Sequence, residues 1–383
     1  MKIGIITHWK DNDNYGAALQ SYALQRYLRN LGHDAFVIRF IPKVEHHSLP
    51  QRIINFIKKP SLLKSYIKLK VKPASVNEWD KLRDFKSFRE KYIAYSPVIY
   101  HGLDELKSNA PEADMYITGS DQVWHGSLNQ RENRAFFLDF GGENTKRISY
   151  AASFGRNYFP CENELLFKNL LQRFSGVSMR EESGVRLLKE RGISAVRSLD
   201  STLLLEGEQY NDIMDERRYK EKFVFFYTVN VGSPDELYWD QIKRYFNQKG
   251  LLCVVTTGSG YKQASEMFDG AIYDYATVPG WLSNIYNSEV VVTASFHGIA
   301  FSLKLKKNFI YMPLKGRHSA GNDRIIDLIK SVGLLDRMAN NWDDVVKLIE
   351  TKIDYSQLEK EMYDSILLQS KNFLTENIKN LIE

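Results

Sequence analysis

Residues Val290 to Pro313 read VVVTASFHGIAFSLKLKKNFIYMP and carry the pattern that decides the fold. An apolar strand is predicted over Glu289–Val292 and ends at a group of small residues. Phe296-His297-Gly298 then begins a helix that leads to a second strand at Asn308–Met312. A strand, helix and strand in this order predict a parallel sheet flanked by helices. Because such sheets bind ligands at the carboxyl ends of their strands, the same stretch indicates where a site would lie.

His297 falls at that edge, in the first turn of the predicted helix. The helix N-terminus favours anions and a neutral imidazole, whereas an anion bound nearby would favour the protonated ring. A histidine in this position is a candidate general acid or base. The alternative interpretation is a residue that only caps the helix or packs against it.

Strands and helices alternate in two separate parts of the chain, which suits its length of 383 residues. The first part opens with a strand at Lys2–Thr7, a helix at Gly16–Leu31 and a strand at Ala35–Ile41, and the pattern restarts after Lys222 with the buried-strand run FVFFYTV. We therefore predict an α/β fold of two doubly wound, Rossmann-like domains, 1–215 and 216–354, that face a cleft. A helix over 355–383 is expected to be long enough to cross back onto the first domain.

Composition excludes several classes of protein. The chain is 43% apolar, yet no run approaches the ~20 apolar residues of a membrane span, and the opening MKIGIITHWK has no apolar stretch of signal-peptide length. A cytoplasmic protein is expected. Its two cysteines suit neither a metal knuckle nor a disulfide framework, and there is no HExxH or similar cluster. We therefore predict no metal-ligating residues and no resident cofactor, and metal dependence stays open.

The charge of the chain is unevenly distributed. No acid lies in 46–77, whereas seven lysines and arginines do, so the formal total of +5 less these seven leaves −2 for the rest. Apolar residues alternate with the cations over 52–73, so this stretch could lie on the anionic inner face of a membrane or receive a lipid-linked acceptor. A solvated helix with a basic face is the alternative. Nucleic-acid binding is not expected, because the basic bias is confined to this excursion.

Two loops that follow predicted strands carry candidate ligand-binding residues. In the first, Asn14 can cap the next helix and Gly16 lets another group approach closely, although a well-capped polar loop explains both. In ITGSDQVW, Asp121 and Gln122 can bind or activate a hydroxyl and Trp124 can stack on a sugar, although a tight turn also favours this sequence.

Cationic side chains follow other predicted strands. Arg180 lies after the extended GVSM and Arg324 opens a later helix, and both suit carboxylate or phosphate groups, with surface ion pairs as the alternative. Lys262 adjoins the glycines of TTGSGYK, a candidate anion nest. Together these residues predict a cleft with donors for a small, highly charged anion.

Six stretches together resemble the polysaccharide pyruvyl transferase family: NYGAALQSYAL, ITGSDQVW, SMREESGVRLL, DSTLLL, ASFHGIAFSLKLKKNF and NDRIIDLIKSVGLLDR. They occur in family order from Asn14 to about Arg337. The resemblance implies a two-domain architecture like that of GT-B glycosyltransferases, with the acceptor on the first domain and the donor on the second. It also implies an enzyme of polysaccharide biosynthesis that transfers pyruvate from phosphoenolpyruvate, its co-substrate, to two hydroxyls of one sugar in an oligosaccharide or lipid-linked glycan, forming a cyclic ketal.

The resemblance assigns roles to particular residues. His297 is then the proton donor, Arg180 holds the phosphoenolpyruvate, and Arg324 matches the arginine at the start of the late helix. Ser295 departs from the pattern, because some members have an arginine there. Either Arg324, Lys262 or Lys304 supplies the positive charge that is missing at Ser295, or the donor differs.

Two other functions stay open at the level of sequence. A GT-B glycosyltransferase that uses a nucleotide sugar would need a carboxylate for the ribose in the second domain, and none is well placed. A non-catalytic relative that binds glycans or anions would be consistent with the loss of an arginine at Ser295. A second departure, Ser201 in DSTLLL where a proline is usual, is interpreted as a change of loop only.

Overall fold

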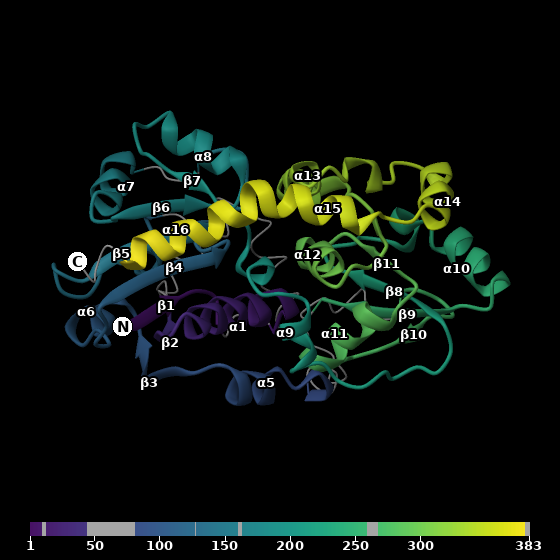
Figure 1. Cartoon of the computed structure of the whole chain (residues 1–383), viewed down its shortest axis with the longest axis horizontal. Helices are drawn as coiled ribbons and strands as arrows, with labels where there is room; N and C mark the ends of the chain where they lie inside the picture. Colours follow the sequence, from purple (N-terminus) through teal and green to yellow (C-terminus); the bar gives the residue numbers. More distant parts are fainter. Residues whose placement is uncertain (10–12, 44–80, 127, 160–162, 259–266, 380–383) are drawn as a thin grey trace, which may run out of the picture.

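The computed structural model describes residues 1–9, 13–43, 81–126, 128–159, 163–258 and 267–379. Within them the chain forms two parallel sheets that lie side by side, each covered by helices (Figure 1). We call each sheet with its helices a lobe. The predicted α/β fold with two Rossmann-like units is confirmed. The basic excursion 46–77, including 52–73, lies outside the described residues.

The first sheet has seven strands in the described residues, in the order β3-β2-β1-β4-β5-β6-β7, and all its neighbours are parallel. Its strands are β1 (Lys2–Ile6), β2 (Asp34–Ile41), β3 (Tyr95–His101), β4 (Met115–Asp121), β5 (Lys146–Ala152), β6 (Gly176–Met179) and β7 (Val196–Arg197). The sequence pattern did not predict β3, which contains Pro97. Proline is tolerated there because β3 is an edge strand.

The second sheet is also parallel, with the described order β10-β9-β8-β11-β12. Its strands are β8 (Phe223–Thr228), β9 (Leu252–Thr257), β10 (Ile272–Tyr273), β11 (Val290–Thr293) and β12 (Phe309–Tyr311). Every residue of β8 and β11 is buried, as expected for strands covered on both faces. The chain order reverses between β8 and β11, which is where parallel sheets open a crevice.

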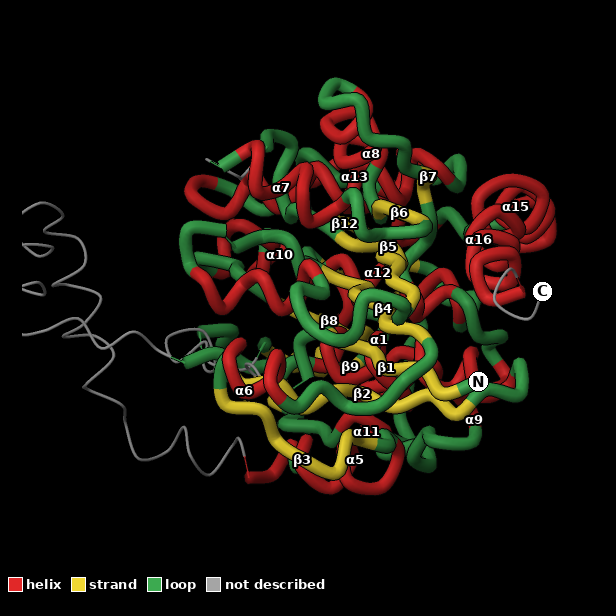
Figure 2. The backbone as a smooth tube through the Cα atoms, turned by 90° about the vertical axis from the view of Figure 1, so that its left-hand side faces the viewer, coloured by secondary structure: helices red, strands yellow, loops and turns green. Residues whose placement is uncertain are grey.

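Helices pack around the two sheets, as the tube in Figure 2 shows from one end of the molecule. The helices of the first lobe are α1 (Tyr15–Asn30), α5 (Phe85–Tyr92), α6 (Leu103–Ser108), α7 (Glu164–Leu171), α8 (Glu182–Lys189) and α9 (Glu208–Asn211). The helices that come after β8 in the chain are α10 (Trp239–Gln248), α11 (Val278–Asn287), α12 (Phe296–Lys304), α13 (Asn322–Ser331), α14 (Trp342–Glu350), α15 (Tyr355–Met362) and α16 (Leu368–Lys379).

One hydrophobic core joins the two lobes. It includes apolar residues of α1 from the first lobe and of α11 and α12 from the second. At its centre Tyr15 stacks on Trp281 with ring centroids 5.2 Å apart, and its hydroxyl donates to the Ala276 carbonyl at 2.6 Å. The first turn of α1 is therefore anchored in the second lobe.

The C-terminal helical segment contacts both lobes. Tyr355 of α15 donates to carbonyl groups of Ser302 and Lys307 in the second lobe. A π-helical turn, Tyr363–Leu367, then leads to α16, which runs over the first sheet (Figure 1). There the Ser370 hydroxyl accepts a hydrogen bond from the Leu199 amide. This segment therefore spans the two lobes.

Candidate functional site

A cavity of about 700 Å³ lies between the lobes, at the carboxyl ends of strands from both sheets. The first lobe contributes residues that follow β1 and β4, and the second contributes residues that follow β8, β9 and β11. Its polar lining residues are His8, Asn14, Asp121, Gln122, His125, Asn133, Asn230, Ser295, His297 and Arg324. The predicted cleft is present, and it brings together most of the predicted site residues.

His297 is carried into this cavity by the turn between β11 and α12. Ser295 ends the turn as the N-cap of α12, and its hydroxyl accepts from the Gly298 amide at 3.5 Å. The His297 residue is only 8% exposed, and its Nε2 has no hydrogen-bond partner. The Nδ1 side of the ring lies against Gly16, where a Cβ atom would come within 1.9 Å. A side chain of the second lobe is thus positioned by a glycine of the first.

The nearest acid to His297 is Asp200, whose Oδ2 lies 3.8 Å from Nε2. Burial lowers the pKa of His297 below its ordinary value, Asp200 and Asp121 act to raise it, and Arg180 and Arg324 lower it further. The ring is therefore biased toward the neutral form. An anion placed beside it would shift the balance toward the imidazolium.

Asp200 was not among the residues predicted for the site. It is fully buried, and its Oδ2 accepts from Arg180 Nη1 at 2.9 Å while its Oδ1 accepts from the Thr202 hydroxyl at 2.8 Å. The stretch DSTLLL contains it, but nothing in that local sequence indicates that a histidine almost a hundred residues later folds against it. Only the assembled fold brings the two together.

Arg180 is the cationic centre of a buried carboxylate cluster. It binds Glu181 and Asp121 in addition to Asp200, at 2.8 and 3.1 Å, and its guanidinium lies 4.3 Å from the centre of the Phe296 ring. Only its Nη2 lacks a partner. Most of its hydrogen-bonding capacity is therefore used within the protein, and it lies behind Phe296 rather than on the wall of the large cavity.

Arg324 differs from Arg180 in having no such partners. It lines the cavity, and in the described part of the chain it makes neither a hydrogen bond nor an ion pair within the usual distances. Burial lowers the pKa of Arg324, and the neighbouring Arg180 lowers it further. A cation in this state is well suited to receive an anionic ligand.

Asp121 faces the cavity from the end of β4. Burial alone would raise the pKa of Asp121, but the charges of Arg180, His297, His8 and Arg324 outweigh it and hold the pKa below its usual range. Asp121 thus stays ionised beside His297.

Ser201 does more than alter a loop. Its hydroxyl donates to the Gln20 carbonyl at 2.8 Å and lies 2.9 Å from the Ser120 hydroxyl, while its amide reaches the same Ser120 oxygen at 3.4 Å. Ser120 in turn lies 3.3 Å from Asp200 Oδ2. A proline at 201 would lack both the hydroxyl and the amide N–H. The serine therefore belongs to the network that supports Asp200, which corrects the interpretation of a loop change only.

The remaining residues predicted on the first lobe are placed in different ways. Asn14 caps α1 by accepting from the Ala17 amide at 3.2 Å, and it lines the cavity with Gln122. The Gln122 carbonyl lies 3.3 Å from Nε2 of His8. Asn14 is thus both a cap and a wall residue, so the structural and functional interpretations are not exclusive.

Trp124 does not offer a face to a sugar. Its ring is fully buried, stacks on Phe137 at 5.0 Å, and donates Nε1–H to the Phe136 carbonyl at 2.9 Å. The predicted stacking on a ligand is wrong, because the aromatic cluster of the first lobe covers the indole.

Two lysines were predicted to replace the charge missing at Ser295. Lys304 is the last residue of α12, at the opposite end of the helix from His297, and its Nζ lies 3.7 Å from Glu206. It does not line the cavity, so its predicted donor-binding role is wrong. Lys262 lies outside the described residues.

The described residues contain neither a group of side chains suited to a metal ion nor a helix suited to spanning a membrane. Among the described residues, no three His, Cys, Asp or Glu side chains are grouped as a metal ion would require. None of the helices in the described ranges has the length and apolarity to cross a bilayer.

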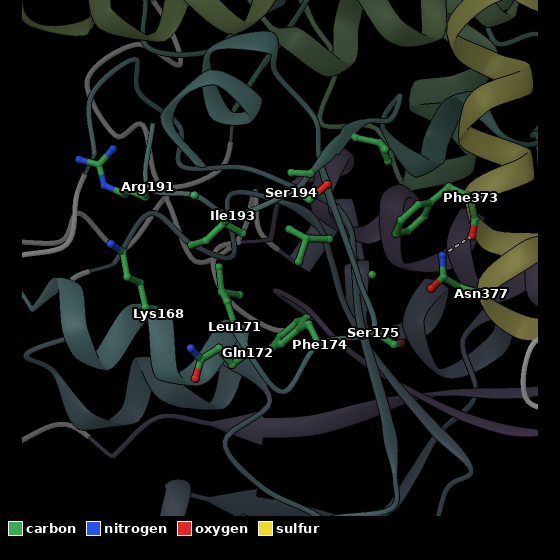
Figure 3. A pocket seen from close by; sticks show the side chains of 15 residues that line it. Lys168, Leu171, Gln172, Phe174, Ser175, Arg191, Ile193, Ser194, Phe373 and Asn377 are labelled. Carbon is green, nitrogen blue, oxygen red and sulfur yellow. Dashed lines mark hydrogen bonds between the residues drawn. The ribbon is translucent and has the colours of Figure 1, made fainter. Parts of the chain in front are cut away.

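A second cavity, of about 500 Å³, lies where β6 and β7 begin, at the sheet edge opposite the lobe cleft (Figure 3). Its walls mix apolar side chains, Phe174 and Phe373 among them, with polar ones such as Gln172 and Asn377. Its two cations, Lys168 and Arg191, both lie near Glu164, at 3.6 and 3.4 Å. The cluster around His297 therefore remains the candidate site.

Comparisons with known proteins agree with this architecture. The family model described as polysaccharide pyruvyl transferase matches residues 14–315. No curated protein sequence matches the chain. Among solved structures, UDP-N-acetylglucosamine 2-epimerase from Rickettsia bellii aligns with 100% of this chain and 97% of its own, at 10% identity and a TM-score of 0.53. A putative UDP-N-acetylglucosamine 2-epimerase from Listeria monocytogenes covers 100% and 96%, at 10% identity and a TM-score of 0.51. At this identity the likeness shows the fold alone, and it confirms the GT-B-like arrangement of two Rossmann-like units.

Proposed function

Because the chain belongs to the polysaccharide pyruvyl transferase family, we propose that it transfers pyruvate from phosphoenolpyruvate to two hydroxyls of one sugar in a glycan. The products are a cyclic ketal and inorganic phosphate. The observation that supports this most is the position of His297 in the wall of the lobe cleft, in the same cavity as Arg324. The buried Nε2 of His297 makes no hydrogen bond and lies 3.8 Å from Asp200 Oδ2.

In this proposal His297 delivers a proton to the methylene carbon of phosphoenolpyruvate. Protonation makes the adjacent carbon oxocarbenium-like, so that a sugar hydroxyl can add to it and release its own proton. Loss of phosphate from that adduct reopens the electrophilic carbon, and the second hydroxyl then closes the ring. The ring of His297 must carry a proton for the first step, although burial by itself disfavours that form.

Charge in the cluster favours the proton once the donor is bound. Two guanidinium groups, of Arg180 and Arg324, are present with three carboxylates, of Asp121, Asp200 and Glu181, so the cluster is net negative when His297 is neutral. A protonated His297 neutralises it, and the anionic donor adds a further attraction for that proton. Arg324 is the cation best placed to bind the donor, with Arg180 Nη2 behind it.

The glycosyltransferase alternative receives less support from the cavity. The residues that the second lobe contributes to its described wall are Val229, Asn230, Gly258, Ser295, Phe296, His297 and Arg324, and none of these is a carboxylate that could bind a ribose. The acceptor, whether an oligosaccharide or a lipid-linked glycan, would enter beside Asp121 and Gln122 of the first lobe.

Phosphate release from phosphoenolpyruvate, in the presence of candidate oligosaccharides, tests the proposal. His297→Ala should stay folded and lose turnover by ~100-fold or more, as expected for loss of a general acid. The matched control is His101→Gln, which changes an exposed histidine at the end of β3 and should leave turnover unchanged. Near-normal turnover of His297→Ala would remove this residue from the mechanism, and a pure binding protein would release no phosphate in either form.

A further inference from the structure

Arg83 is a buried arginine whose charge the described structure leaves largely uncompensated. It lies in the helical turn before α5 of the first lobe, is 3% exposed, and reaches into the second lobe. There its Nη2 donates to the Thr257 hydroxyl at 3.2 Å. Its Nε and Nη1 have no hydrogen-bond partner, and no carboxylate of the described residues lies within ion-pair distance of it.

The other buried arginines among the described residues are not in this state. Arg337 is 2% exposed and donates four hydrogen bonds to backbone carbonyls, two of them to Phe309. Arg147 is equally buried and donates five. An arginine that serves only the fold is thus saturated by carbonyl groups here. Arg83 makes one such bond, to a hydroxyl, and lies 5.5 Å from the centre of the Tyr275 ring.

The place of Arg83 in the fold points to a ligand. Thr257 ends β9 and pairs in register with Thr228, which ends β8, and the Thr228 hydroxyl is also buried without a partner. The next residues along both strands, Val229 and Gly258, line the lobe cavity. Unsatisfied donors therefore gather at the carboxyl edge of the second sheet, where parallel sheets bind ligands.

We propose that Arg83, Thr257 and Thr228 form a binding site for a phosphoryl group, separate from the His297 cluster. A buried guanidinium without an anion is costly, whereas charge-assisted bonds to phosphate oxygens would satisfy it. A phosphoryl group offers three strongly accepting oxygens, which suit the two unpartnered guanidinium nitrogens and a hydroxyl better than the two oxygens of a carboxylate do. Phosphate binding at this site does not require ketal formation, so it can be tested independently of the proposed transfer.

Two sources could supply this phosphoryl group. One is the donor, through the phosphate that it releases. The other is a phosphorylated acceptor, whose phosphate would be bound by the second lobe while its sugar lies beside Asp121 and Gln122 of the first lobe and reaches His297. The chemistry at Arg83 is the same for both, so the ligands used in the experiment have to separate them.

The test is a calorimetric titration of the full chain with inorganic phosphate, carried out in the Arg324→Gln background so that binding beside His297 is weakened. Adding Arg83→Gln should weaken phosphate binding by about tenfold or more, as for loss of a charge-assisted bond. Arg83→Lys should retain most of the affinity because it keeps the charge. Arg337→Gln is the matched control, a buried arginine that should affect stability but not phosphate binding.

Thermal unfolding in phosphate-free buffer gives an independent readout. Arg83→Gln should leave the melting temperature unchanged or raise it, because it removes an uncompensated buried charge, whereas Arg337→Gln should lower it. The proposal is overturned if Arg83→Gln binds phosphate as its parent does. It is equally overturned if that variant fails to fold and the folded Arg83→Lys does not respond to phosphate.

Competition then identifies the source. If phosphoenolpyruvate displaces phosphate from the Arg83-dependent site in the Arg324→Gln background, the donor is the occupant. If a sugar 1-phosphate displaces it and phosphoenolpyruvate does not, the acceptor is. Absence of Arg83-dependent binding for all three ligands would overturn the site while leaving the proposed transfer to its own test by phosphate release.

Discussion

A Cβ atom on Gly16 would lie 1.9 Å from Nδ1 of His297, so these two residues from opposite lobes are in direct contact. Gly16 is the second residue of α1, and His297 is the second residue of α12. The missing side chain at 16 is what lets the imidazole lie against the first helix with its Nε2 toward Asp200. The candidate proton donor is therefore carried by one lobe and oriented by the other.

Gly16→Ala should displace the His297 ring and lower turnover by about 100-fold, because a misplacement of about 1 Å can have that effect on catalysis. The protein should remain folded, since the ring can move into the adjoining cavity. Phosphate release and thermal unfolding measure the two quantities. Gly142→Ala is the control, because the nearest atom to its Cβ would be Thr145 Oγ1 at 3.6 Å, an ordinary contact. Equal turnover for both variants would refute the positioning role.

Asp200→Asn should change the pH dependence of kcat/KM. Asp200 acts to raise the pKa of His297, so removing its charge lowers that pKa further. A general acid works while protonated, and its activity falls as pH rises through its pKa. The limb at high pH should consequently move to lower pH in the variant. A limb that stays in place or moves upward would show that His297 does not respond to Asp200.

Asp121→Asn tests how the buried charges contribute to stability. Arg180 and other cations hold the pKa of Asp121 below its ordinary value, against the effect of burial. The carboxylate therefore stabilises the fold above its unfolded pKa of about 4, and this contribution is lost as pH falls through the lower folded pKa. Asparagine also tolerates the left-handed backbone at this position, where φ is 72°.

The free energy of unfolding of Asp121→Asn should be about 1.5–3 kcal/mol lower than that of the parent at pH 7, the range for a hydrogen bond to a charged group. Urea titrations at pH 7 and at pH 3 measure it. The difference between the two proteins should shrink at the lower pH. A difference that is the same at both values would contradict the charge-based account.

Tyr15→Phe isolates one hydrogen bond between the lobes. The Tyr15 hydroxyl donates to the Ala276 carbonyl at 2.6 Å in a fully buried setting, so its loss should cost about 1 kcal/mol of unfolding free energy. Tyr15→Ala should cost about 3–5 kcal/mol, since it also removes the ring from the shared core. Tyr158→Phe, at a 58% exposed position, should change stability by less than about 0.5 kcal/mol. Equal effects of Tyr15→Phe and Tyr158→Phe in denaturant titrations would exclude the bond between lobes as a stabilising contact.

The fold could be predicted from the sequence because strands buried on both faces, such as β8 and β11, are continuous apolar runs. It also placed His297 and Ser295, since a small-residue stop before a helix is a local signal. It missed β3, where Pro97 is permitted only by the edge position that the complete sheet reveals. Apolar runs and helix starts can thus be predicted from local sequence, whereas an edge position cannot.

The partners of the site residues could not be read in the same way. Asp200 meets His297, and Arg180 meets Asp121, only through contacts between distant segments. Trp124 has the composition of a sugar platform, but its burial depends on the surrounding phenylalanines. Lys304 was chosen for its charge, yet nine residues of helix place it beside Glu206. The type of a residue indicates which interactions its side chain can make. The tertiary fold determines which partners it has.

The core that runs without a break from α1 into α11 and α12 also bears on how the molecule comes apart. Two sheets in one chain could in principle unfold in two steps. Here neither lobe can unfold without exposing the core residues of the other lobe to water. Heat should unfold both together, with matching calorimetric and van't Hoff enthalpies. Destabilising substitutions far from the cleft should then reduce the whole native population rather than loosen the candidate site locally.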